Sequence, residues 1–133
     1  MSSVSARALV RLHVLHGVAR LALRVMSPAR AQRAVGLAAR FATPFASEED
    51  ARVGTRALGS SGTCLTRALA VAALLPGSEV AIGVDPRRAA KLHAHAWVEL
   101  NGRPLDDNQA SEAGGVERMG SLGGRERPER ASP

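Results

Sequence analysis

The sequence predicts one small α+β domain, with helices first, a small antiparallel sheet after them, and a tail. Residues 4–75 contain apolar runs separated by helix start and stop signals, without the alternation typical of strands. After Pro76-Gly77 the pattern changes to short segments with a period of two residues. With 133 residues, of which 45% are hydrophobic, the chain is long enough to bury one core.

Four helices are predicted from their boundary signals. The first is a run of Ala, Leu and Val without proline. Ser27-Pro28 supplies an N-cap followed by proline at the first helical position. Ser47 precedes three acidic residues, which the helix dipole favours in a first turn. The fourth helix begins at Cys64 after a Gly-containing loop. The predicted helices cover residues 4–26, 28–40, 47–59 and 64–75.

Strands are predicted at residues 79–84 and 93–100, and Asn101-Gly102 is a strong hairpin signal that returns the chain along residues 103–107. From about residue 108, Gly, Ser, Glu, Arg and Pro dominate, so we expect a disordered tail. The predicted organisation is a basic helical region at 1–46, a core at 47–107 and the tail at 108–133.

Composition narrows the classes of function. The net charge is +6, and residues 1–46 hold seven arginines and no acidic residue. Such a segment attracts acidic partners, although codon bias toward Arg and Ala explains the same excess. Aromatic residues make up only 2%, which argues against nucleic-acid binding by base stacking. The longest uncharged stretch between Arg11 and Arg20 is too short for a membrane span, so we expect a cytoplasmic protein.

The one cysteine of the chain, Cys64, excludes an internal disulfide and suits a reducing compartment. Unpaired amides and the dipole at a helix start stabilise a thiolate, the nucleophilic form of cysteine. A lone cysteine is also often a small buried hydrophobe. His95 is the better candidate base, because His93 lies nearer the start of its strand and is expected at the surface. The helical His13 and His16 are expected to be structural or exposed.

A third group is needed to orient the base, and the hairpin supplies two candidates. With a two-residue turn, Trp97 pairs with Asp106, which then shares the face of His95. With a three-residue loop, Asp107 stands opposite His95 instead. Glu99 lies on the same face but farther along, and we expect it to be half-solvated.

At these residues the sequence resembles the transglutaminase-like leader peptidases of lasso-peptide biosynthesis. Three segments carry the resemblance in order: GTCLTRALAVAALL, EVAIGV and AHAWVELNGRPLDD. The matching residues are Cys64, Leu65, Arg67, Ala68, Leu69 and Ala70; Ile82, Gly83 and Val84; and His95, Ala96, Trp97, Val98, Glu99, Gly102 and Arg103. The spacing from His to Asp in that family points to Asp107, with Asp106 as the second candidate.

The resemblance implies a cysteine peptidase with a Cys64, His95 and Asp107 triad that removes the leader from a ribosomally made precursor peptide. It also implies a separate leader-recognition protein as partner, and an ATP-dependent macrolactam synthetase that uses the amine set free. We expect no cofactor, no metal and no nucleic acid. Arg67, although part of the matching motif, is expected to be a solvated or structural helix residue.

Three other interpretations stay open. Transglutaminases and arylamine acetyltransferases use the same Cys, His, Asp order for acyl transfer. A catalytically inactive interaction module is the second. A metal site of Cys64, His95 and an Asp is the third, although no local pair of ligands supports it.

Overall fold

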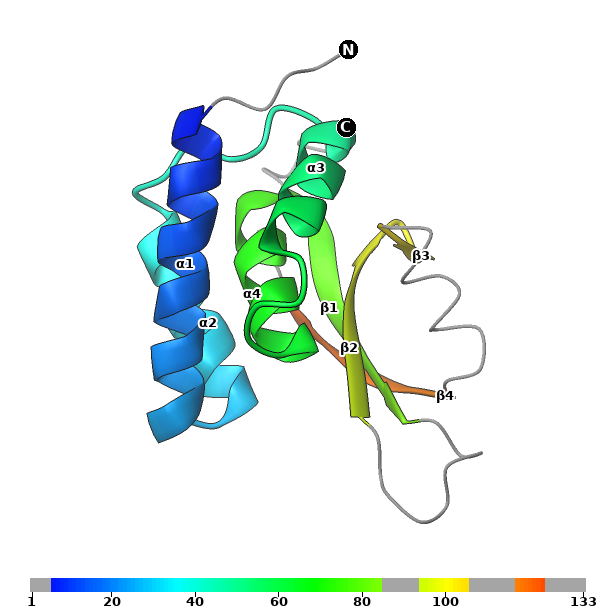
Figure 1. Cartoon of the computed structure of the whole chain (residues 1–133). Coiled ribbons are helices and arrows are strands. Elements are labelled where there is room, and N and C mark those ends of the chain that lie inside the picture. The colour runs from blue at the N-terminus through cyan, green and yellow to red at the C-terminus, as the bar shows by residue number, and fades with distance from the viewer. Residues whose placement is uncertain (1–5, 85–93, 106–116, 124–133) are drawn as a thin grey trace, which may run out of the picture.

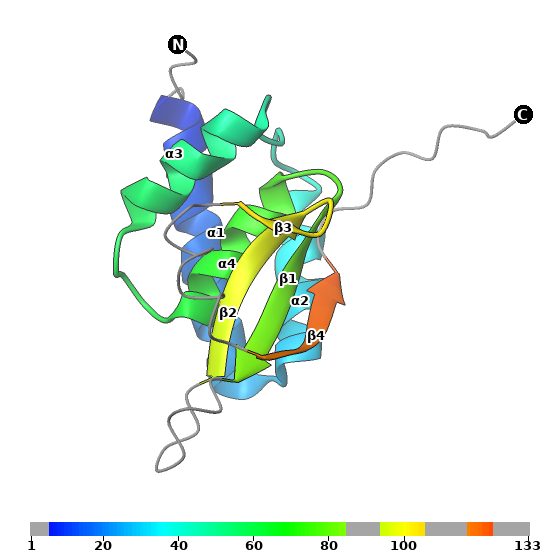
Figure 2. The same ribbon diagram turned by 90° about the vertical axis from the view of Figure 1, so that its right-hand side faces the viewer.

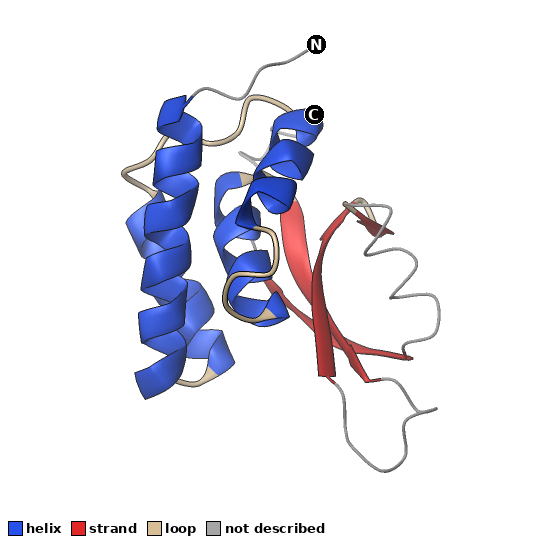
Figure 3. Ribbon diagram, viewed as in Figure 1, coloured by secondary structure: helices blue, strands red, loops and turns tan. Residues whose placement is uncertain are grey.

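The computed structural model describes residues 6–84, 94–105 and 117–123. The predicted α+β class is confirmed, with helices on one side and a sheet on the other (Figure 3). All four predicted helices are present, and each differs from its predicted bounds by only a few residues. They are α1 (Ala6–Val25), α2 (Pro28–Ala39), α3 (Glu48–Leu58) and α4 (Cys64–Leu74).

The sheet is antiparallel, and its four strands lie in the order β3-β2-β1-β4. The strands are β1 (Ser78–Val84), β2 (Ala94–Leu100), β3 (Arg103–Pro104) and β4 (Glu117–Gly123). The first three lie where the sequence predicts them. The prediction of a disordered tail from residue 108 is wrong for Glu117–Gly123, because this segment pairs with β1 and forms an edge of the sheet (Figure 2). The rest of the predicted tail lies outside the described residues.

The helix starts follow the predicted capping chemistry. The Ser27 hydroxyl accepts the amide of Arg30 at 3.4 Å, and Pro28 follows it. The Ser47 hydroxyl accepts the amide of Asp50 at 3.2 Å. In both cases the side chain satisfies an amide that the helix itself leaves without a partner.

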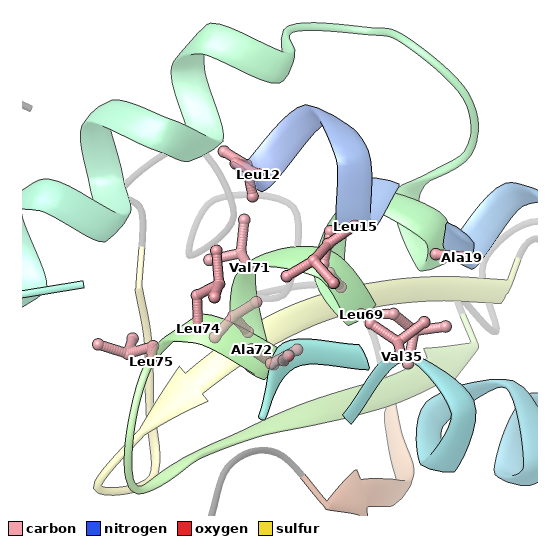
Figure 4. Packing of buried hydrophobic residues seen from close by; sticks show 14 of the residues in the cluster. Leu12, Leu15, Ala19, Val35, Leu69, Val71, Ala72, Leu74 and Leu75 are labelled. Atoms are coloured by element: carbon pink, nitrogen blue, oxygen red, sulfur yellow. The ribbon is translucent and has the colours of Figure 1, made fainter. Parts of the chain in front are cut away.

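Helix α4 lies between the other helices and the sheet (Figure 1). It is apolar on nearly all sides because it packs against α1 and α2 on one side and against β1 and β2 on the other. Figure 4 shows Leu12, Leu15 and Val35 meeting α4 residues such as Leu69. The N-terminal helices therefore share one hydrophobic core with the sheet.

One row of side chains from the sheet enters this core. Val80 and Val98 are paired across β1 and β2, and both are buried in the cluster, with Ala96 and Leu100 packed against it. The connection from α4 to β1 is short, and the Ser78 hydroxyl donates to the carbonyl oxygens of Ala72 and Leu75 at 3.1 and 2.7 Å. No helix in the described part of the chain is both long and apolar enough to cross a membrane.

Candidate active site

Cys64 is the first residue of α4 and is partly exposed. A reciprocal capping box precedes it. The Thr63 hydroxyl accepts the amide of Thr66 at 3.2 Å, and the Thr66 hydroxyl oxygen accepts the amide of Thr63 at 3.0 Å. Neither bond uses the Cys64 amide. This amide belongs to the first turn of the helix, at the positive end of the helix dipole.

The loop before Cys64 is held closely. Gly62 has φ +66°, a conformation that favours glycine. The Arg67 guanidinium donates to the carbonyl oxygens of Ser61 and Gly62 at 3.0 and 3.3 Å, from one turn inside the helix. Of the two roles expected for Arg67, solvated or structural, these two bonds support the structural one.

His16 of α1 reaches this loop. Its Nε2 atom lies 2.9 Å from Oγ1 of Thr66, in a buried hydrogen bond that joins residues 50 positions apart. The sequence prediction left His16 as either structural or exposed, and the structure shows it buried and structural. Burial, followed by the positive charges of Arg20, Arg67 and His13, lowers the pKa of His16 from its ordinary 6.5. The Thr63-x-x-Thr66 spacing could have indicated the capping box, but no local signal indicates a contact with His16.

The contact with His16 also fixes the side of α4 on which Cys64 lies. Thr66 points toward α1, and two residues along an α-helix correspond to a rotation of about 200°. Cys64 therefore lies on the opposite side of α4 from Thr66.

His95 is the second residue of β2. β1 runs antiparallel to β2 and returns from the end of α4, so β2 and α4 start at the same end of the molecule (Figure 1). The topology thus brings Cys64 and His95 to one end of two packed elements. Among the hydrogen bonds within the described part of the chain, none joins the thiol of Cys64 to the His95 ring.

The alternation along β2 puts His95 in one row with Trp97 and Glu99, as predicted. This is the face of the sheet opposite the row of Val98 that packs against the helices. Glu99 was expected to be half-solvated, and this is wrong: it is 6% exposed, and its Oε2 accepts the Trp97 indole N–H at 3.0 Å. The bond satisfies one oxygen of a buried carboxylate and fixes the indole beside it.

The hairpin that leads to the candidate acids has a two-residue turn. Asn101 and Gly102 have φ 55° and 77°, and Leu100 pairs with Arg103. The alternative of a three-residue loop is therefore wrong as far as the described residues extend. Asp106, Asp107 and His93 lie outside the described residues.

Within the described ranges, no group of three or more His, Cys, Asp or Glu residues is arranged to hold a metal ion. This finding does not include the two candidate aspartates. The described residues place Cys64 at a capped helix start and His95 near the start of β2, at the same end of the molecule, with the His95 row on the face of the sheet turned away from the helices. A cysteine at a helix start and a histidine at the same end of the molecule are the residue types that thiol-based nucleophilic catalysis uses.

A protein-family model matches the chain. Residues 3–117 match the model described as transglutaminase-like superfamily, which is most of the chain. Searches of curated proteins and of solved structures gave no match. The match runs through all four helices, including α4 with Cys64, and through β2, which carries His95. The chain belongs to the transglutaminase-like superfamily, whose members are typically cysteine enzymes.

Proposed function

We propose that this protein is a cysteine peptidase that cuts the leader from a ribosomally made precursor peptide, as in lasso-peptide maturation. The observation that supports it most is the position of Cys64 at the capped start of α4, at the same end of the molecule as the start of β2, where His95 is the second residue. Membership of the superfamily supports a thiol mechanism. The leader as substrate rests on the motifs from Cys64 to Asp107.

In the proposed reaction, His95 takes the proton of the Cys64 thiol and the thiolate attacks the carbonyl carbon of the scissile peptide bond. The Cys64 amide donates to the oxyanion that forms. Collapse of the intermediate breaks the C–N bond, and the imidazolium returns its proton to the leaving amine. Water, deprotonated by His95, then hydrolyses the thioester and restores the thiol. The released amine is the group that an ATP-dependent macrolactam synthetase would use.

Asp107 is the proposed orienter of His95, and Asp106 is the second candidate. The two-residue turn supports Asp106, since in an unbroken register it is Trp97 that pairs with Asp106. The motif spacing supports Asp107, which then requires one extra residue in the return strand, as in a β-bulge.

The direct test uses a precursor peptide with its leader, incubated with the wild-type chain, Cys64→Ala and His95→Ala. The proposal expects cleavage at one position by the wild type and none by Cys64→Ala, with both variants folded. Transfer of the acyl group to an added amine in preference to water would favour an acyl transferase. A biosynthetic function that survives in Cys64→Ala would favour an inactive interaction module.

The separate leader-recognition protein is the proposed partner, and the outer face of α1 is its proposed docking surface. The exposed apolar side chains of this face are Val10, Val14, Leu21 and Val25. Between them is an open hollow of about 250 Å³, lined by Gly17, Arg20, Leu21 and Arg24. An apolar side chain flanked by carboxylates fits a hollow with two guanidinium groups at its rim, and residues 1–46 carry no acidic residue to oppose it.

Two variants test this surface. Gly17→Leu fills the hollow, because a Cβ at that position would have no atom within 4 Å. Leu21→Glu adds a carboxylate beside Arg20 and Arg24, which weakens the attraction for an acidic partner and removes an apolar contact. Both should weaken binding of the recognition protein at least tenfold. Leu37→Glu, at an exposed apolar position of α2, is the matched control and should bind normally. Normal binding by Gly17→Leu and Leu21→Glu, or loss of self-association or of binding to anionic vesicles instead, would overturn this assignment.

A further inference from the structure

We propose that His16 is a positioning residue for Cys64: it fixes the start of α4 through Thr66 and so sets the reactivity of the thiol. This inference rests on the proposed function, because it assumes that Cys64 is the nucleophile. His16 is on α1 and does not reach the reacting atoms itself. Its contribution is transmitted through the cap of α4.

The hydrogen bonds around Thr66 link the histidine to the cap. The Thr66 hydroxyl oxygen accepts the amide of Thr63 at 3.0 Å, and its proton points to the carbonyl oxygen of Thr63 at 2.9 Å. The remaining lone pair faces Nε2 of His16 at 2.9 Å. This hydroxyl is fully satisfied when the imidazole donates from Nε2–H. Thr63 and Thr66 enclose Cys64 in the sequence, so any shift of Thr66 moves the amide and thiol of Cys64.

His16 packs closely against the loop at Gly62. A Cβ at Gly62 would lie 2.6 Å from Oγ1 of Thr66 and 2.8 Å from Nε2 of His16. Real Cβ atoms do not approach polar atoms so closely, so the imidazole is packed directly on the backbone of Gly62. His16 is only 4% exposed. The loop, the cap and the imidazole therefore form one packed unit.

Burial first, and then the positive charges that face His16, lower its pKa and so favour the neutral ring. Arg20 and His13 come from its own helix and Arg67 from α4, and all three oppose a second positive charge there. The Arg67 guanidinium is itself held by the carbonyl oxygens of Ser61 and Gly62. A neutral ring can be replaced by an amide with little electrostatic change, and this makes Gln the conservative substitution at this position.

The experiment measures the alkylation rate of Cys64 by iodoacetamide as a function of pH. It compares the wild type with His16→Gln, His16→Leu, Thr66→Val and the double variant His16→Leu/Thr66→Val. His13→Gln, an exposed position on the same helix, is the matched control. Urea unfolding of each variant identifies the folded ones. His16→Gln and Thr66→Val are close in size to the native residues, so the comparison holds even where His16→Leu does not fold.

The proposal expects His16→Leu and Thr66→Val to raise the apparent pKa of the thiol and to slow alkylation near neutral pH by roughly three- to tenfold. His16→Gln and His13→Gln should match the wild type. The double variant should be no slower than the slower single variant, because both changes break one linkage. A purely structural role would alter the unfolding midpoint but leave the pH profile of the folded protein unchanged.

Two results would overturn the proposal. One is a wild-type pH profile in folded His16→Leu or, where that variant does not fold, in Thr66→Val. The other is a double variant whose effect equals the product of the two single effects. An ordinary thiol pKa of about 8.5 in the wild type itself would instead contradict the proposed function. Failure of the inference and failure of the function are therefore distinguishable in one data set.

Discussion

The Nε atom of Arg52 donates a hydrogen bond of 2.8 Å to the carbonyl oxygen of Leu105, joining α3 to the strand that returns from the hairpin. The same guanidinium forms ion pairs with Glu48 and Glu49 on its own helix. Leu105 is buried, and its amide donates to the carbonyl oxygen of Val98 at 2.9 Å. Leu105 is the residue immediately before Asp106. Arg52 thus fixes the backbone at the point from which the candidate acids extend.

Arg52→Ala should lower the free energy of unfolding by about 1–2 kcal/mol, because Leu105 loses a charged hydrogen-bond donor. Arg52→Lys should lose most of the same amount, since an ammonium cannot reproduce the planar donor set that serves Leu105 and both glutamates. Urea unfolding is the measurement. Arg56→Ala, at an exposed position of the same helix, is the control and should change little. Equal stabilities for all three variants would contradict this role for Arg52.

Gly62→Ala should destabilise the protein by about 2 kcal/mol or more, through its positive φ and the close approach to Thr66 and His16. Gly102→Ala is a matched control, because Gly102 also has a positive φ but a Cβ added there would have no atom within 4 Å. It should cost about 1 kcal/mol. If denaturant unfolding gives the same cost for both, Gly62 is required for its backbone conformation alone.

The pH dependence of stability should contain a contribution from His16. The unfolded chain binds the proton with a pKa near 6.5, and the folded protein binds it only at lower pH. In that window the unfolded state holds more protons, so the free energy of unfolding rises with pH up to about 6.5. Comparison of urea unfolding at about pH 5 and about pH 7.5 should show a smaller difference in His16→Gln than in the wild type. An identical difference in both would contradict a neutral, buried His16, and His13→Gln controls for the neighbouring histidine.

The two candidate acids are separated by their amide variants. We expect Asp107→Asn to lower the cleavage rate on the order of 10²–10⁴-fold, since an amide cannot hold His95 in the required tautomer. Asp106→Asn should keep most of the activity. The opposite result would mean that the pairing of β2 with the return strand continues in the register seen from Leu100 to Pro104. The measurement is kcat on a precursor peptide, with folding checked by urea unfolding.

Local signals predicted the parts of the fold that depend on local physics. The caps at Ser27 and Ser47 and the Asn101-Gly102 turn each satisfy backbone groups within a few residues, so their sequence patterns are informative. The β4 segment was missed because Glu117–Gly123 has few apolar residues, and it becomes a strand only by pairing with β1. The register shift between Ile82 and Gly83 falls at a glycine inside β1, a residue typical of β-bulges, but the shift depends on the pairing with β4, which the sequence did not predict.

In the candidate site, too, the features that depend on local patterns were predicted, and those that depend on distant contacts were not. Cys64 at a helix start and His95 on a strand follow from helix and strand patterns. The contact of His16 with Thr66 spans 50 residues, and nothing local to either residue predicts it. The burial of Glu99 depends on its bond to Trp97 and on what covers that face of the sheet, which alternation alone does not determine.

The most direct test of the catalytic pair is the rate of Cys64 alkylation against pH in the wild type and in His95→Ala. An imidazolium beside a thiolate at a helix start should lower the thiol pKa to about 7 or below, and the value should return to about 8.5 when His95 is replaced. That result would establish the Cys64 and His95 pair. A pKa of about 8.5 in both proteins would contradict the account, because the thiol would then have neither a base nor an activating charge.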